Sequence, residues 1–259
     1  SALSMSSEAV QLVGWGLGGL LFATIGLLPT TFIILILYII SSFLMLFLPK
    51  AEVEVLDSET NLEILLKGWK LVARDPRLRL FVSANLLEIF SNTIWVSSII
   101  LVFVTELLNE TESYWGYSNT AYSIGIIISG FIAFRLSEKF LAAKWESILF
   151  PLVAMAIVTL TILYFPNAQM FLLFSALVGM LSQLKEVPES VFLQETVEEN
   201  HLVNVYSVLE VISTLAFSVF VLLMSYITES FGISISFWLS AICLMIEAIL
   251  IYIRRDYFK

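Results

Sequence analysis

The feature that most constrains this chain is a series of eight apolar runs separated by polar connections. A bilayer's hydrocarbon core requires about 20 apolar residues in helical form, and the run at 80–108 exceeds that length. Of the residues, 59% are hydrophobic and only 14% are charged, which is far from the composition of a soluble domain. We therefore predict an all-α membrane protein. Its eight transmembrane helices are expected at 9–25, 30–48, 80–108, 114–134, 148–164, 170–182, 203–227 and 233–253.

The positions of the cationic residues support this arrangement. All 13 Lys and Arg residues fall in alternate connections or after the last run, and the other connections contain none. Connections rich in Lys and Arg face the cytoplasm in most membrane proteins. The sequence therefore predicts a multi-pass protein of the cell (inner) membrane with a cytoplasmic C-terminus. In this interpretation Lys185 lies in the cytoplasmic connection between the sixth and seventh spans.

The run at 80–108 carries an acidic residue, Glu88, within apolar sequence. Polar and aromatic residues recur there at steps of three and four: Asn85, Glu88, Asn92, Trp95 and Ser98. A continuous helix places them on one face, and an ionised group that faces lipid is costly, so this face is expected to line a wet cavity. Our hypothesis is that Glu88 binds a proton or a cationic substrate, with Asn85, Asn92 and Trp95 lining the cavity beside it. The alternative is that Glu88 pairs with Lys185 or caps a neighbouring helix.

Two further carboxylates, Glu210 and Glu247, are embedded in apolar runs. Counted from the cytoplasmic end at about 1.5 Å per residue, they and Glu88 lie roughly 9 to 12 Å deep, in one layer. A proton-coupled exporter needs buried groups of this kind, although Glu210 and Glu247 could also be structural or snorkelling residues. Tyr122, about two turns into the fourth run, is a further candidate for the cavity.

The sizeable polar segment at 51–75 separates the second and third runs. An apolar stripe recurs within it at helical spacing: Leu62, Leu65, Leu66, Trp69 and Val72. The pattern predicts an amphipathic helix on the inner leaflet, held by acyl chains and anionic headgroups. A plain linker between two bundles is the other interpretation, and the two are compatible.

Four short motifs follow one another along the chain. They are QLVGWGLGG at 11–19, Gly68 with PRLR at 76–79, GFIAFRLSEK at 130–139, and FLQETV at 192–197 with VYS at 205–207. Their order resembles spans five to twelve of a major facilitator superfamily transporter, in the macrolide-efflux or enterobactin-exporter-like branch. The chain departs from those motifs at Trp15, where a proline is usual, after Gly130, where an aspartate is missing, and at 203–204, where Gly-Arg is usual.

The resemblance implies a fold and a function. It implies a six-helix C-terminal bundle at 79–259, a cytoplasmic linker at 50–78, and the last two helices of the N-terminal bundle at 1–49, with the first four helices of that bundle missing. It also implies antiport by alternating access, with proton-driven efflux of a drug or amphipathic metabolite and hence drug resistance. Arg135, Lys139 and Gln194 would then act in gating or in cytoplasmic loops. The alternative is a non-transporting membrane scaffold or regulatory protein, which the departures from the motifs favour.

Other classes of function find no support in the sequence. Gly-rich phosphate loops, paired His ligands and nucleophile elbows are missing from it, so an enzyme is not predicted. The single Cys243 and single His201 cannot form a Cys or His cluster, and we expect no metal or cofactor. A net charge of −9 disfavours nucleic acid as a partner. The expected partners are the lipid bilayer, protons and a small amphipathic substrate.

Overall fold

The computed structural model describes residues 27–47, 61–142 and 144–258, and these residues form helices joined by short connections. The first part of this region contains α2 (Leu27–Met45), α3 (Asn61–Arg74), α4 (Pro76–Asn92), the 3-10 turn η1 (Thr93–Trp95), α5 (Ser97–Val102) and the π-helical turn η2 (Phe103–Leu107). The second part contains α6 (Ser113–Ala142), α7 (Lys144–Tyr164), α8 (Ala168–Thr196), α9 (Glu199–Phe231), α10 (Ile233–Ile253) and the 3-10 turn η3 (Arg255–Phe258). The predicted all-helical fold is confirmed.

Four of the described helices, α7 to α10, are long and apolar enough to cross a membrane, and the bent pair formed by α4 and the segment after it would be a fifth. α2 is a shorter apolar helix. The predicted span at 9–25 and the motif at 11–19 lie outside the described residues. The count of eight spans therefore stays a prediction.

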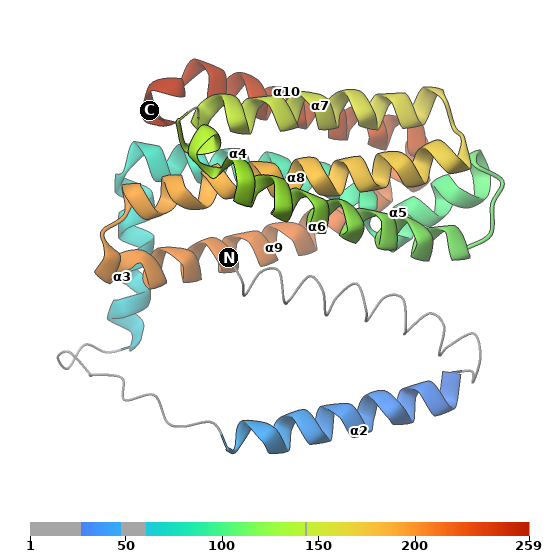
Figure 1. Ribbon diagram of the computed structural model, residues 1–259, viewed down its shortest axis with the longest axis horizontal. Helices are drawn as coiled ribbons and strands as arrows, with labels where there is room; N and C mark the ends of the chain where they lie inside the picture. Colours follow the sequence, from blue (N-terminus) through green and yellow to red (C-terminus); the bar gives the residue numbers. More distant parts are fainter. Residues whose placement is uncertain (1–26, 48–60, 143, 259) are drawn as a thin grey trace.

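The helices from α3 onward form one bundle, and α2 runs apart from it (Figure 1). Within the bundle, α8 packs against α6 and α7, α10 packs against α7 and α4, and α9 packs against α3 and α4. Aromatic rings fill the centre. The ring of Phe103 lies 5.0 Å from that of Phe237 and 5.4 Å from that of Phe171, measured between centroids. These contacts join η2 to α8 and α10.

The contact between α6 and α8 depends on two glycines. A Cβ on Gly125 would collide with the carbonyl oxygen of Ala176, and a Cβ on Gly179 would collide with the carbonyl oxygen of Tyr122. Because lipid provides no hydrophobic drive for helix association, small residues that allow backbones to approach are the usual solution in membranes. The same approach brings the hydroxyl of Tyr122 within 3.1 Å of Ser182 Oγ.

α3 packs on another helix, which the amphipathic pattern alone does not reveal. Val72 is buried against α9, and a Cβ on Gly68 would lie 2.5 Å from the carbonyl oxygen of Asn204 and 2.8 Å from Val208 Cγ2. Trp69 is exposed. The side chains of the leucines in the predicted stripe lie outside the described part. Part of the stripe therefore faces protein.

The start of α4 has a complete N-cap. Asp75 Oδ1 accepts a hydrogen bond from the backbone N–H of Arg77 at 2.8 Å, and Pro76 occupies the first helical position, where no N–H is needed. The guanidinium of Arg77 also pairs with Asp75 Oδ2 at 3.0 Å. This cap fixes the entry of the chain into the helix that carries Glu88.

The expected continuous helix at 80–108 is wrong. α4 ends at Asn92, Val96 is extended (φ −69°, ψ 144°), and the axis bends by 44° before the chain continues. Two local features of the sequence favour a break in the helix here. Thr93 Oγ1 donates a hydrogen bond to the carbonyl oxygen of Phe90 at 2.6 Å, and β-branched residues crowd this stretch. The predicted polar face therefore stops at η1, and the Ser98 side chain lies outside the described part.

A buried lysine among three carboxylates

Lys185 is part of helix α8, contrary to the prediction that it lies in a cytoplasmic connection. The apolar run was predicted to end at residue 182, but α8 continues to Thr196. Within this extension Lys185 and Glu189, one turn apart, form an ion pair. Lys185 is 1% exposed and is buried in the bundle.

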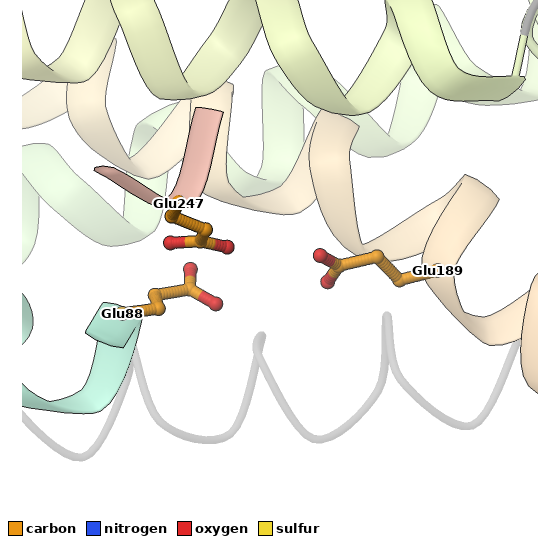
Figure 2. A group of neighbouring side chains, drawn as sticks. All are labelled: Glu88, Glu189 and Glu247. Atoms are coloured by element: carbon orange, nitrogen blue, oxygen red, sulfur yellow. The ribbon is translucent and has the colours of Figure 1, made fainter. Parts of the chain in front are cut away.

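The ammonium group of Lys185 contacts carboxylates from three helices. Nζ donates hydrogen bonds to Glu88 Oε2 on α4 at 2.7 Å and to Glu189 Oε1 on α8 at 2.6 Å. Glu247 Oε1 on α10 lies 3.8 Å from Nζ, within ion-pair range but beyond hydrogen-bonding distance. Figure 2 shows the three carboxyl groups gathered in one place, with that of Glu247 facing that of Glu88. We call Lys185, Glu88, Glu189 and Glu247 the charge cluster.

Burial differs between the carboxylates of the charge cluster. The side chains of Glu88 and Glu189 are 13% and 15% exposed, whereas that of Glu247 is 0% exposed. Both carboxylate oxygens of Glu247 lack a hydrogen-bond partner. A buried polar group without a partner is rare and costly, so Glu247 is the unusual member.

The charge cluster carries more negative than positive charge. With every group ionised, one ammonium and three carboxylates sum to −2 (+1 − 3), and the one buried cation of the described region cannot balance them. One oxygen from each carboxylate lies within 4.8 Å of the others, a spacing that a metal ion could bridge, but the ammonium of Lys185 lies among them. The arrangement suits a small exchangeable cation such as a proton.

The ion pair between Glu88 and Lys185, raised above as the alternative, is present in the structure. Sequence reasoning missed Glu189, although its spacing four residues after Lys185 is the usual signal for a helical ion pair. Glu247 was a candidate, and the structure places it beside Glu88. Glu210 was expected in the same layer, but it is exposed on α9 and is not part of the charge cluster.

The remaining candidates lie outside the charge cluster. Asn85 Oδ1 accepts a hydrogen bond from Ser213 Oγ on α9 at 3.0 Å, and Trp95 stacks on Phe171 with 6.3 Å between ring centroids. Asn92 is exposed. Arg135 and Gln194, predicted for gating or cytoplasmic loops, are exposed as well, and the side chain of Lys139 lies outside the described part.

A layer of aromatic rings lies near the charge cluster on the same elements. Phe81 on α4 stacks with Phe192 on α8 at 6.1 Å between centroids, and Phe192 contacts Phe258 of η3 at 4.4 Å. Phe81 lies two helical turns before Glu88, and Phe192 lies about one turn after Glu189. The rings therefore join α4, α8 and η3 about one to two helical turns from the charge cluster.

Comparison with known proteins identifies the family. The family model for the Major Facilitator Superfamily matches residues 82–259. The chain belongs to this superfamily. The matched region contains all four residues of the charge cluster, so the cluster is part of a Major Facilitator Superfamily bundle.

Two similar proteins come from Bacillus subtilis (strain 168). The chain is 28% identical over 250 residues to the uncharacterized MFS-type transporter YfmI, and 27% identical over 253 residues to the uncharacterized MFS-type transporter YjbB. These alignments cover 95% and 98% of this chain, but the chain spans 62% of the length of each relative. No solved structure matches significantly. The names specify no substrate, so the macrolide-efflux or enterobactin-exporter-like branch stays a prediction.

Proposed function

We propose that this chain is part of a proton-coupled secondary transporter that exports a drug or amphipathic metabolite. The observation that carries the proposal is the charge cluster, in which the buried Lys185 and Glu247 lie beside the partly exposed carboxylates of Glu88 and Glu189 among apolar helices. Ionisable residues inside membrane bundles are costly, and they commonly belong to proton relays or substrate paths. A site with surplus negative charge is suited to take up and release a proton.

The proposal includes the arrangement of the whole protein. Residues 79–259 would form the C-terminal bundle, 50–78 the cytoplasmic linker, and 1–49 the end of the N-terminal bundle. Transporters of this architecture work by rocking two halves around a site near the midplane. Four further helices of the same protein would supply the rest of the first half. The protein would lie in the cell membrane with its C-terminus in the cytoplasm.

The exposed apolar residues of α9 are consistent with this arrangement. Leu215 and Leu222 on α9 are 62% and 74% exposed, as expected for a surface that faces lipid or another bundle. Glu210 lies on the same helix and is also exposed, so it is accessible from outside this bundle. It therefore provides a matched control, because it is a carboxylate in apolar sequence but outside the charge cluster.

The test is proton-driven uptake of fluorescent amphipathic dyes into inverted membrane vesicles that contain the full-length protein. We expect an imposed pH gradient to drive uptake, Glu88→Gln to abolish it, and Glu210→Gln to leave most of it. A gradient that drives no uptake of any dye, or equal uptake by parent and Glu88→Gln vesicles, would contradict the proposal. Protein levels in the vesicle membranes serve as the control for expression.

A further inference from the structure

We propose that Glu247 holds the exchangeable proton of the charge cluster, while Lys185 stays paired with Glu88 and Glu189. This inference rests on the proposed function, because it names the residue that carries the proton in proton-coupled transport. It assigns the main proton-binding role to Glu247 on α10 and not to Glu88, which was the candidate from the sequence. Two observations carry the inference: the absence of a hydrogen-bond donor at the fully buried Glu247, and the facing carboxyl group of Glu88.

The first observation is the unequal distribution of hydrogen bonds. Lys185 donates to Glu88 at 2.7 Å and to Glu189 at 2.6 Å, so each of these carboxylates has a charged donor. Glu247 has no donor on either oxygen and lies 3.8 Å from the ammonium. Charge-assisted hydrogen bonds stabilise the ionised forms of Glu88 and Glu189, whereas no comparable bond stabilises an ionised Glu247.

The second observation is the facing carboxyl group. Glu247 and Glu88 point toward each other, and the nearest oxygens of the charge cluster lie within 4.8 Å (Figure 2). A proton on Glu247 removes the charge repulsion between the two facing carboxylates. A hydrogen bond from its O–H to Glu88 requires the two oxygens, which lie within 4.8 Å of each other, to approach to about 3 Å. The proton also reduces the formal charge of the cluster from −2 to −1.

The charged and titratable groups around Glu247 come from several elements. α4 contributes Glu88, and α8 contributes Lys185 and Glu189. Cys243 lies one turn before Glu247 on α10 itself. On the packed neighbours, Glu146 and Tyr164 lie near the two ends of α7, while Tyr206, Glu210, Tyr226 and Glu229 of α9 are exposed. Lys185 is thus the cation of the described region that contacts Glu247.

The exposed fractions of the Glu88 and Glu247 side chains indicate the route of the proton. Glu247 is fully buried, whereas Glu88 faces it and is partly exposed. A hydronium ion at the partly exposed side of Glu88 gives up its proton: one of its O–H bonds breaks and an O–H bond to Glu88 forms. That bond then breaks as the proton forms an O–H bond with Glu247, which leaves a water molecule outside and Glu88 ionised and paired with Lys185. Release runs through the same two carboxyl groups in reverse. Glu88 is therefore the entry residue, and Glu247 holds the proton.

The experiment is infrared difference spectroscopy of the purified full-length protein between neutral and alkaline pH. A protonated carboxyl group has a C=O band separate from the bands of carboxylates. We expect this band in the parent, its loss in Glu247→Gln, a shift in Glu88→Gln, and no change in Glu210→Gln. Persistence of the band in Glu247→Gln, or its absence from the parent, would overturn the assignment.

A second measurement keeps the assignment testable if a variant is unstable. Glutamine resembles a neutral glutamic acid, so Glu247→Gln is expected to keep the parent melting temperature, whereas Glu189→Gln is expected to lower it. A larger fall in melting temperature in Glu247→Gln than in Glu189→Gln would overturn the assignment. The two proposals can fail separately. Unchanged proton-coupled transport in Glu247→Gln rejects only the role of Glu247, and an intact band without any proton-driven transport rejects only the proposed function.

Discussion

Replacing Lys185 with Met removes the cation of the charge cluster while keeping an unbranched side chain of similar length. Glu88 and Glu189 then lose hydrogen bonds of 2.7 and 2.6 Å, and three carboxylates remain in a site where Lys185 itself is 1% exposed. Breaking a buried ion pair by removing one partner costs about 3–5 kcal/mol. We expect a loss of stability of that size near neutral pH and a smaller loss in acid, because protonated carboxyl groups need no counter-ion.

Thermal unfolding of the detergent-solubilised full-length protein measures this loss. The matched control is Lys70→Met, which removes an exposed lysine of α3 outside the predicted spans and is expected to change stability by less than about 0.5 kcal/mol. The triple variant Lys185→Met/Glu88→Gln/Glu189→Gln should recover much of the loss, because the unpaired charges are removed with the lysine. A Lys185→Met protein as stable as the parent, or equally destabilised at every pH, would show that Lys185 does not hold the carboxylates together.

Three further predictions concern packing and capping. Gly125→Leu should lower stability by about 1–3 kcal/mol because its side chain would collide with the Ala176 carbonyl of α8, and unchanged thermal unfolding would refute this close contact. Tyr122→Phe removes the hydrogen bond to Ser182 and should cost about 1 kcal/mol in the same assay. Asp75→Ala should cost roughly 1 kcal/mol through loss of the α4 cap. Burial of Asp75 acts to raise its pKa, but the hydrogen bonds and charge of Arg77 outweigh it and lower that pKa. The contribution of Asp75 should therefore be present above about pH 4 and fade as pH falls further, and a cap effect unchanged in acid would contradict this.

The apolar runs were sufficient to predict helices, because spacing and composition determine where a chain can cross a bilayer. They could not predict where each helix ends. Lys185 and Glu189 look like part of a polar connection in the sequence, and only the approach of α4 and α10 makes their burial possible. The break at Val96 has a local signal in Thr93 and the β-branched residues around it, but the apolar run conceals it.

The candidate site was found in part for the same reason. Glu88 and Glu247 were noticeable as single carboxylates in apolar sequence, and the structure places them face to face. Glu210 has the same local pattern, yet it lies on an exposed face of α9. Sequence periodicity shows which residues share a face of one helix, but it does not show which helices pack against that face. It therefore could not predict that Glu247 is buried and Glu210 is exposed.

The most direct test of the central claim is a count of the protons that the full-length protein releases when a transported dye binds, measured with a pH indicator in weakly buffered detergent solution. If the charge cluster is the coupling site and Glu247 holds its proton, the parent and Glu210→Gln proteins should release protons in step with binding, and Glu247→Gln should release none. Equal release by the parent and Glu247→Gln proteins would contradict the claim.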